Sequence, residues 1–569
     1  MSLRIAIAPL TIVGDQLQLI AESVQDLLLR EVGLSQNFTV ISKQSTELAF
    51  QRSDDIYEIG HQLDILGIIQ GSISEKNGYQ VILTYSRLDK KETKEKVFLL
   101  AKNDIFKLGE SCLKAVLEFL QLKESSQHSK PVAKLMNPKL HQKFLLGDYH
   151  FNRWTQDNVA EAISLFEEVI VAQPNFAPVY LKLAKCYIFQ AGRGHQWPNT
   201  VYPLAREAIK KALALNPTSG EAIIHSNLID FFFDLDWRNV YSSIEIGLKN
   251  YVDASEAYQQ LSFFWYGLKK YDAALDALYS ALEFDPLSTG ILNMIGDVQL
   301  SAKRYDDSEK TFLSILKMVP NDAASLENLM YLASLRGNEN LASRYLRKLE
   351  KALPESSPYV PRMGYFYGRF NLQKEASNYL EHFERLEAEQ KNRVFHNYKS
   401  QVYAGSGDWE RVMDCIEKGW KARTGILYIL TDPQLEPLHN WKRYQTIIGQ
   451  VRFPKNIAEV DYVTLHTDIK EKVRINLSSL LFAKAEDNYT RLYFFQNFRI
   501  EEKLLRATLK TVASQLPEHF LRVHRTYLFN TAKPFKVFGN SKTRYILQSQ
   551  HNFEIPVSRS FDLSILNPS

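Results

Sequence analysis

The sequence has few cysteines, no long apolar run and no glycine-rich phosphate loop. Cys112, Cys186 and Cys415 lie far apart and form no CxxC pair, which favours reduced, buried thiols over disulfides or a zinc site. The longest apolar runs, at 63–69 and 231–235, are much shorter than a membrane span, and no cleavage site of small residues follows the first strand-like residues. We therefore expect a cytoplasmic protein with no membrane segment, metal or cofactor. No catalytic constellation stands out, so we do not expect an enzyme.

The charge is unevenly distributed although the net charge is only +4. From Arg474 to the end there are 14 Lys and Arg against 7 Asp and Glu, a balance of +7. The remainder has 55 against 58, a balance of −3. A positive field gathered in one region is typical of nucleic-acid binding. A chain of 569 residues is also too long for one core, so we expect about three domains.

Residues 1–122 are predicted to form an α/β domain with a mixed sheet. Strand-like segments such as LRIAIAPL alternate with amphipathic helical segments up to residue 121. The wording IAIAPL, followed by DDIYEIGHQLDILGIIQGSISEKNGYQVILTYSRLD, resembles the TolB-like modules that stand ahead of helical repeat arrays in bacterial regulators and cyclases. The next segment, 123–138, is polar and contains two prolines, which predicts a linker.

The middle of the chain repeats itself every 34 residues. Three segments end in proline: YDAALDALYSALEFDP at 271–286, YDDSEKTFLSILKMVP at 305–320 and ENLASRYLRKLEKALP at 339–354. Small residues recur at matched places, at Ala274, Ser308 and Ala342, where helices can approach closely. This pattern resembles the tetratricopeptide repeat (TPR), a helix–turn–helix unit that stacks into a solenoid. We expect an all-α solenoid over 139–454, with seven or eight units up to about residue 423 and a cap at 431–454.

The concave surface of such a solenoid suits a peptide or helix of another protein. Two aromatic-rich runs, 231–237 and 263–271, could line this groove. The other interpretation is that these aromatic side chains pack between helices, as they usually do at helical spacing. We favour packing in the core.

From Asn476 the pattern changes to short strands. After a linker at 455–475, we predict a mainly-β domain over 476–569. A hairpin is expected at 480–495, with its turn at 486–489. A helix is expected at 501–516, with Leu504, Leu505, Leu509 and Val512 on one face. Further strands are expected at 526–530, 534–538, 543–548 and 553–557.

Motifs of this last stretch resemble the LytTR family of bacterial DNA-binding domains. They are the turn Glu-Asp-Asn-Tyr, a Leu-rich segment, FLRVHRTYLFN at 520–530 and IPVSRSF at 555–561, in the family's order and spacing. The resemblance implies a mostly β fold whose loops, rather than a recognition helix, enter successive major grooves of double-stranded DNA. It also implies sequence-specific transcriptional control and a homodimer on paired sites.

The resemblance places the DNA-facing positions on three short segments: the turn at Asn488, Tyr489 and Thr490, then Arg525, then Arg559. Each of the two arginines can donate a fork of hydrogen bonds to O6 and N7 of guanine, which discriminates by about 1–3 kcal/mol. Asn488 or Thr490 could bond a base edge or a phosphate.

Other basic residues nearby are better suited to hold phosphates, which sets register without reading sequence. They are Arg491, Arg522, Lys484 and Lys533. Lys484 stands where the family usually carries an acid. His524 is either a packed imidazole or a further DNA contact, and we expect Asn530 to satisfy turn backbone.

The chain therefore reads as a bacterial transcription regulator in which the solenoid receives a protein or peptide partner. The alternative is a TPR scaffold whose C-terminal domain binds protein instead of DNA. Salt distinguishes the two, because DNA binding through several Lys and Arg weakens steeply as salt rises.

Overall fold

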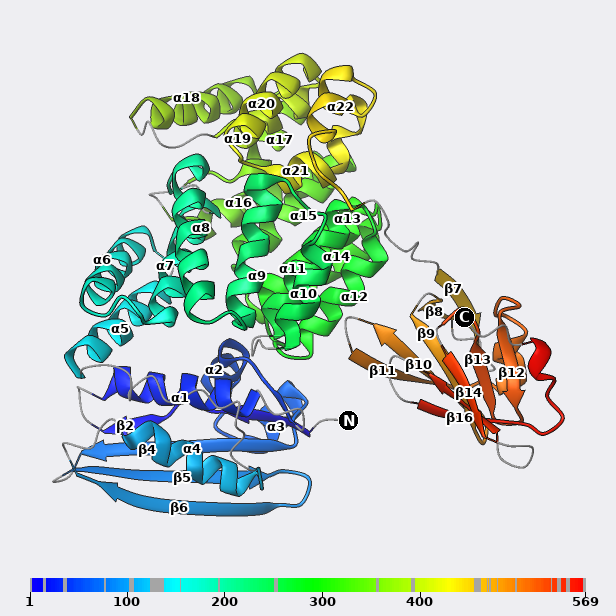
Figure 1. Cartoon of the computed structure of the whole chain (residues 1–569). Coiled ribbons are helices and arrows are strands. Elements are labelled where there is room, and N and C mark those ends of the chain that lie inside the picture. The colour runs from blue at the N-terminus through cyan, green and yellow to red at the C-terminus, as the bar shows by residue number, and fades with distance from the viewer. Residues whose placement is uncertain are drawn as a thin grey trace. The chain divides into compact units, whose positions relative to one another are not determined.

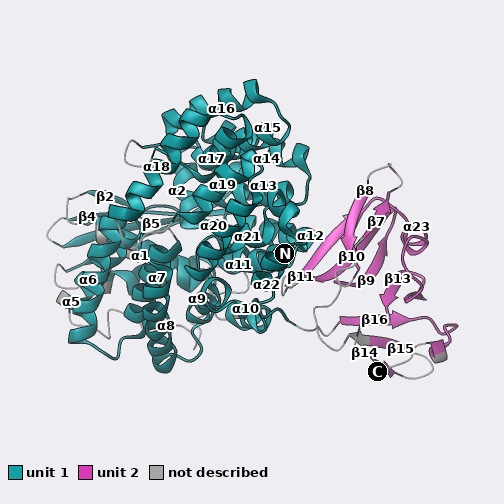
Figure 2. Ribbon diagram, turned by 90° about the horizontal axis from the view of Figure 1, so that it is seen from above, with its two compact units in different colours: residues 1–454 teal, residues 455–569 magenta. Residues whose placement is uncertain are grey.

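A computed structural model describes the chain in two compact units, residues 1–454 and 455–569 (Figure 2). It describes all residues except 1–2, 14–16, 34–37, 76–77, 102–106, 123–137, 154, 193–194, 250–253, 355–357, 390–394, 455–461, 468, 470–471, 478, 497–498, 534, 540–543, 549–552 and 566–569. The fold class is as expected: an α/β domain and an all-α solenoid in the first unit, and a mainly-β second unit (Figure 1). The predicted linker at 123–138 lies almost wholly outside the described residues.

The first unit begins with a mixed sheet in the order β3-β1-β4-β5-β6, with β2 paired to β4. Its elements are β1 (Leu3–Ile7), β2 (Thr11–Val13), α1 (Gln18–Gly33), β3 (Phe38–Val40), α2 (Lys43–Arg52), α3 (Ile56–Leu63), β4 (Gly67–Glu75), β5 (Tyr79–Arg87), β6 (Glu92–Leu100) and α4 (Lys107–Phe119). Strand β1 pairs in parallel with β3 and β4, whereas β4, β5 and β6 are antiparallel.

Helices cover both faces of this sheet. Side chains alternate along each strand, so one strand contributes to a core on either face. Ile5 and Ile7 of β1 share a core with α1 and α4, while Ala6 packs in a second core with α2 and α3. Helix α2 did not emerge from the sequence pattern. The resemblance to TolB-like modules remains a prediction.

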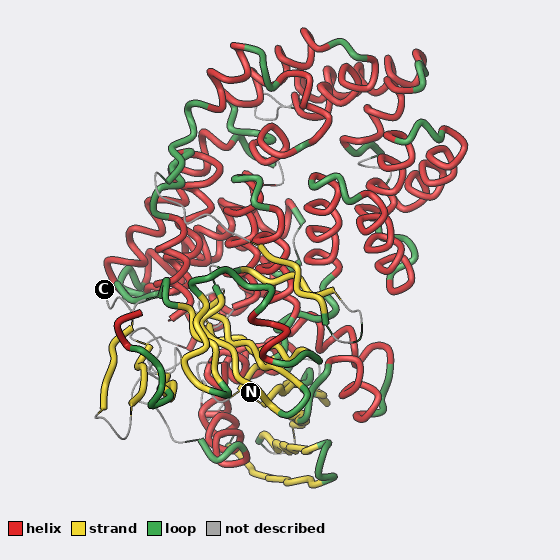
Figure 3. The backbone as a smooth tube through the Cα atoms, turned by 90° about the vertical axis from the view of Figure 1, so that its right-hand side faces the viewer, coloured by secondary structure: helices red, strands yellow, loops and turns green. Residues whose placement is uncertain are grey.

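After this domain the described residues form sixteen helices, α5 to α20, in eight consecutive pairs, at the upper end of the predicted count. Figure 3 shows how helices dominate this part of the chain. They are α5 (Pro138–Phe151), α6 (Gln156–Ala172), α7 (Ala177–Gly192), α8 (Pro198–Leu215), α9 (Gly220–Ile229), α10 (Val240–Lys249), α11 (Ala254–Gly267), α12 (Tyr271–Leu282), α13 (Thr289–Ser301), α14 (Tyr305–Met318), α15 (Ala323–Leu335), α16 (Glu339–Ala352), α17 (Pro361–Arg369), α18 (Gln373–Glu389), α19 (His396–Ser406) and α20 (Trp409–Lys421). A π-helix, η3 (Asp230–Asp234), extends α9.

The aromatic runs pack in the core, as the sequence favoured. Phe231, Trp237 and Phe264 are fully buried, and the rings of Phe231 and Trp237 lie 4.8 Å apart. Phe453, from the end of the solenoid, contacts the Trp237 ring with centroids 5.4 Å apart. A backbone hydrogen bond joins the same two segments: Trp237 N donates to Arg452 O at 3.0 Å. The last residues of the unit therefore close back onto an early repeat.

The cap is formed by α21 (Ile426–Thr431), the 3-10 helix η4 (Pro433–Leu438) and α22 (Lys442–Ile448). It packs against the first helices of several repeats. The hydroxyl of Tyr331 on α15 donates to Asp432 at 3.2 Å, and Gln434 donates to Gln401 of α19 at 3.0 Å. Residues 426–438 therefore cover a face of the solenoid to which α11, α15 and α19 contribute.

The α/β domain is joined to the solenoid by buried polar contacts at the start of α2. Ser42 N donates to Phe284 O at 2.7 Å, and Leu287 N donates to Ser45 Oγ at 2.8 Å. Both serine hydroxyls donate to the Asp285 carboxylate. These bonds explain why the two domains form one compact unit.

The second unit contains one five-stranded and two smaller sheets, in the orders β11-β10-β9-β13-β12, β14-β15-β16 and β7-β8. Its elements are β7 (Tyr462–His466), β8 (Lys472–Asn476), β9 (Leu480–Glu486), β10 (Tyr489–Gln496), β11 (Arg499–Leu505), α23 (Leu509–Ala513), β12 (Phe520–His524), β13 (Tyr527–Asn530), β14 (Phe535–Gly539), β15 (Arg544–Gln548), β16 (Phe553–Val557) and η5 (Leu563–Ile565). The predicted strands after residue 476 are present.

Two predictions for this unit are corrected by the structure. The helix expected at 501–516 is the edge strand β11 followed by the short helix α23, because residues 499–505 pair along β10. Leu504, assigned to the apolar helix face, is 48% exposed. The expected linker at 455–475 includes the hairpin β7–β8, whose Leu465 and Val473 join the core of the second unit.

All three cysteines are buried free thiols, as expected. Burial raises the pKa of Cys112 and of Cys186 to about 12 and that of Cys415 to about 11, so these thiols stay protonated at neutral pH. Within the described residues, no helix has the length and the apolar character needed to cross a membrane.

Candidate DNA interface

Two hairpin turns meet at one end of the five-stranded sheet. The first joins β9 to β10 through Asp487 and Asn488, and the second joins β12 to β13 through Arg525 and Thr526. The end of β9 pairs with the start of β13, with Lys484 opposite Tyr527. A backbone bond of 2.8 Å from Ala485 N to Thr526 O joins the two hairpins directly. The antiparallel register therefore brings two segments about forty residues apart in sequence to the same edge.

A third segment reaches the same edge after β16. Ser558 N donates to Val523 O at 2.8 Å, which fixes the chain beside the end of β12 just before Arg559. We call these three segments, 487–488, 525–526 and 558–559, the loop cluster. The structure thus brings together all three segments that the sequence predicted to face DNA.

Arg525 is the most available cation of the loop cluster. It is exposed in its turn, and its guanidinium has no partner among the described residues. Its backbone is held in place, since Arg522 Nη2 donates to Arg525 O at 2.7 Å. Arg522 therefore stabilises the turn that presents Arg525. Arg559 is also exposed.

His524 supports the same turn. Its Nδ1 lies 2.8 Å from the Thr526 hydroxyl and accepts from Thr526 N at 3.3 Å. The ring is half-buried. An acceptor at Nδ1 corresponds to the neutral tautomer with its proton on Nε2.

The first turn divides its residues between surface and core. Asn488 and Tyr489 are exposed, and Asp487 takes a positive φ of 52° that a two-residue hairpin turn favours. Thr490 is fully buried, and its hydroxyl donates to Ala507 O at 2.8 Å. This bond anchors the start of β10 to the segment after β11.

Arg491 is engaged within the domain. Its guanidinium bonds Glu486 at 2.8 Å and Glu502 at 3.1 Å. The bond to Arg491 holds the pKa of the Glu486 carboxyl below its usual range, and the two acids raise the pKa of Arg491. Lys484 lies 3.4 Å from the same Glu486. Two of the basic residues predicted to hold phosphates thus flank the turn as ion pairs.

The remaining predicted residues lie beyond the two turns. Lys533 is half-buried, and burial lowers the pKa of its ammonium. Asn530 is buried, with its Nδ2 donating to Leu480 O at 2.7 Å and its Oδ1 accepting from Ala532 N at 3.0 Å, so its role is structural as expected. The polar loop at 539–544 falls largely outside the described residues.

Sequence reasoning missed Arg506. It follows β11 directly, and the end of β11 pairs with the start of β10, with Leu505 opposite Thr490. Arg506 is exposed at the same edge as the loop cluster, and no described residue pairs with it. The predicted helix hid this position, whereas a strand prediction for 499–505 would have placed a cation at a strand end.

Across the described ranges, no three His, Cys, Asp or Glu side chains lie close enough together to hold a metal ion.

Comparison with known proteins supports the DNA-binding interpretation. Residues 470–564 match the family model of the LytTr DNA-binding domain. An uncharacterized response regulatory protein of Vibrio cholerae is 37% identical over 90 residues, which are 15% of this chain and 33% of that protein. Tetratricopeptide repeat protein 37 of Xenopus laevis is 21% identical over 230 residues, or 40% of this chain and 14% of that protein. The chain thus spans a third or less of these relatives.

Solved structures resemble the chain only distantly. PilW, a type IV pilus biogenesis factor, is 16% identical with a TM-score of 0.32, over 43% of this chain and all of PilW. The human IFIT1 dimer is 16% identical with a TM-score of 0.38, over 60% of this chain and 77% of that chain. The C-terminal match is the informative one: over residues 470–564, this chain carries a LytTr DNA-binding domain.

Proposed function

We propose that the chain is a bacterial, cytoplasmic transcription regulator that binds double-stranded DNA sequence-specifically, and that its TPR solenoid binds a protein or peptide partner. The observation that carries the proposal is the convergence of three loop segments, with an unpaired Arg525, at one edge of the LytTr domain. Exposed arginines on short, well-anchored turns suit insertion into a major groove.

The site residues divide into three roles. Arg525 and Arg559 read base edges, and Asn488 and Tyr489 contact a base edge or a phosphate. Four further cations or imidazoles contact phosphates from the rim: Arg522, His524, Lys533 and Arg506. Thr490 and Arg491 position the first turn, since the former is buried and the latter is paired with two carboxylates.

Part of the solenoid surface is not accessible to the proposed partner. Residues 426–438 already cover a face built by α15 and α19. A partner segment either displaces this cap or binds the repeats ahead of α11. DNA affinity and dimerisation on paired sites are the properties that the partner would change.

The test is selection of bound sequences from random duplexes, with residues 455–569 alone and with the whole chain. Wild type should enrich one motif, and Arg525→Ala should flatten one position of it by about 1–3 kcal/mol of base preference. Lys472→Ala removes an exposed cation on β8, outside the loop cluster, and should leave the motif unchanged. An unchanged motif in Arg525→Ala, or no enrichment by folded protein, would refute the proposal.

A further inference from the structure

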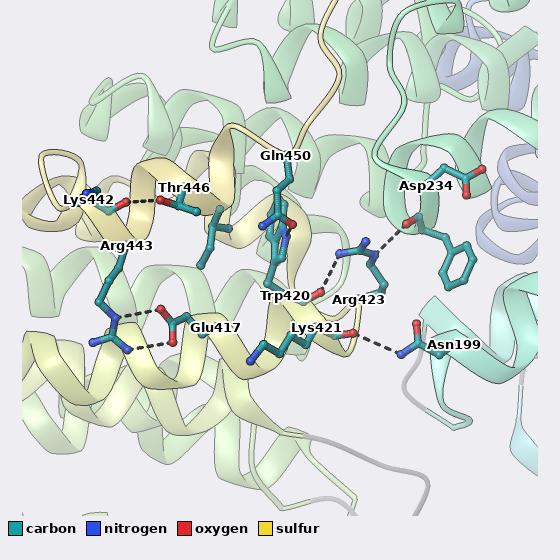
Figure 4. A pocket seen from close by; sticks show the side chains of 12 residues that line it. Asn199, Asp234, Glu417, Trp420, Lys421, Arg423, Lys442, Arg443, Thr446 and Gln450 are labelled. Carbon is teal, nitrogen blue, oxygen red and sulfur yellow. Dashed lines mark hydrogen bonds and ion pairs between the residues drawn. The ribbon is translucent and has the colours of Figure 1, made fainter.

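A pocket of about 880 Å³ lies where an early repeat meets the last helices of the solenoid (Figure 4). Asn199 of α8 and Phe233 and Asp234 of η3 form one side, and residues of α20 and α22 form the other. Hydrogen bonds join the two sides: Asn199 Nδ2 donates to Lys421 O at 3.3 Å, and Arg423 Nε donates to Phe233 O at 2.9 Å. The volume is in the range of small-molecule sites.

One wall of the pocket is an irregular helix. The sequence DFFFD at 230–234 adopts a π-helix, and Leu235 after it has a positive φ of 55°. The irregular segment is fixed from the far end of the solenoid, since Arg452 N donates to Leu235 O at 2.8 Å. Single π-helical turns are rare and occur frequently at functional sites.

The two carboxylates that line the pocket each have an arginine partner. Arg443 bonds Glu417 at 2.9 Å and also bonds Asp414 at 2.7 Å and Glu410 at 3.1 Å outside the lining, and Arg206 is ion-paired with Asp234. Lys421 and Lys442 are exposed and have no ion-pair partner in the described part of the chain. Four cations, Lys421, Arg423, Lys442 and Arg443, therefore stand against two carboxylates in the lining of the pocket.

Arg423 is the most unusual of these cations. Its Nε and Nη1 donate to the carbonyls of Phe233 and Trp420, at 2.9 and 3.0 Å, and Nη2 has no partner among the described residues. Burial lowers the pKa of this guanidinium, with Asp234 partly offsetting the effect. A half-buried guanidinium that bonds two carbonyls and no carboxylate favours the binding of an anion.

We propose that this pocket binds a small organic phosphate. Arg423, fixed by two carbonyls, presents its free Nη2 to a phosphate oxygen, Lys421 and Lys442 add charge at the rim, and the Phe233 side borders the organic part. The ligand would bridge η3 and α20, which lie almost two hundred residues apart. The inference rests on the proposed sensory role of the solenoid, whose input it extends from a protein partner to a phosphorylated small molecule.

The test is calorimetric titration of the full-length protein, without DNA, with pyrophosphate and with ADP. Pyrophosphate presents the charge alone, whereas ADP adds an organic part that the pocket has room for. We expect both to bind, ADP more tightly. We expect Arg423→Gln to weaken both by about tenfold or more, as the loss of a charge-assisted bond does.

Two further variants keep the test decisive if Arg423→Gln unfolds. The double variant Lys421→Gln with Lys442→Gln changes only exposed residues and should also weaken the binding of both ligands. Lys348→Gln on α16, away from the pocket, should leave the binding of both unchanged. Absence of binding by both probes, or binding that ignores the pocket variants, would overturn the inference. Because no DNA is present, this result is independent of whether the C-terminal domain binds an operator.

Discussion

Arg362 of the solenoid and Arg525 of the C-terminal unit hold their charge in different environments. In the solenoid, Arg362 Nη2 lies 3.5 Å from Asp297, its backbone N bonds Glu327 at 2.9 Å, and its guanidinium stacks 4.5 Å from the Tyr331 ring. In the C-terminal unit, Arg525 and Arg506 are exposed and unpaired within the described residues. A cation that pairs inside the fold maintains structure, whereas a cation that is exposed and unpaired on an anchored turn is available to a ligand.

The largest expected effect comes from breaking the internal charge cluster. Arg362→Met should lower the free energy of unfolding by about 3 kcal/mol, because it leaves the buried carboxylate of Asp432 and the half-buried carboxylates of Asp297 and Glu327 without their cation. The measurement is chemical denaturation of the full chain, followed by tryptophan fluorescence. Arg336→Met removes ion pairs to Asp306 and Glu309 on the surface and should cost less than about 1 kcal/mol. Equal losses in the two variants would contradict the contrast.

Removing the charge of the half-buried acid Asp230 should instead stabilise the fold. Burial and the neighbouring Asp234 raise the pKa of Asp230 to about 6, from an ordinary value of 3.8. As pH rises, the unfolded chain loses this proton at a lower pH than the folded chain does. The stability that the protonated carboxyl contributes to the folded state is therefore complete below pH 3.8 and is lost as pH rises to about 6. Asp230→Asn should therefore increase the free energy of unfolding at pH 7.5 by up to about 2 kcal/mol, seen as a higher unfolding midpoint. The gain should vanish near pH 4; a gain that persists there would be inconsistent with this account.

The repeats were predictable because they are local. A 34-residue period and terminal prolines define each helix pair within its own segment, and Pro286, Pro320 and Pro354 all follow second helices as expected. The cap was recognisable as a segment, but its position across α15 and α19 was not, since Tyr331 and Asp432 are a hundred residues apart. Contacts of that kind depend on the curvature of the whole solenoid.

The convergence of the turns proposed to face DNA was predictable from their motifs, but the surroundings of single residues were not. Thr490 and Arg491 look surface-exposed in a polar turn, yet pairing of β10 with β11 buries the first and gives Glu502 to the second. The same pairing explains why residues 501–505 form part of β11 and not the predicted helix. The sequence EEKLL is compatible with either structure, and hydrogen bonding to β10 determines which one forms. Arg506 became visible only after that correction.

A smaller effect is expected at Arg506. Arg506→Ala should weaken binding to all DNA sequences by less than about tenfold and reduce the slope of log affinity against log salt by about one, as loss of one phosphate contact does. Fluorescence anisotropy with the selected and a scrambled duplex measures both quantities. Lys503→Ala, which removes another exposed cation of β11 farther from the edge, serves as the matched control. Loss of affinity for the selected duplex alone would instead make Arg506 a base-reading residue.

The most direct test of the central claim is the salt dependence of operator binding by the full-length protein. If the edge that carries the loop cluster binds double-stranded DNA, with Arg506, Arg522 and Lys533 on phosphates, log affinity should fall linearly with log salt, with a slope of roughly −3 per domain. Folded protein that binds no duplex in low salt, or whose binding does not change as salt rises, would contradict the account and favour a protein-binding scaffold.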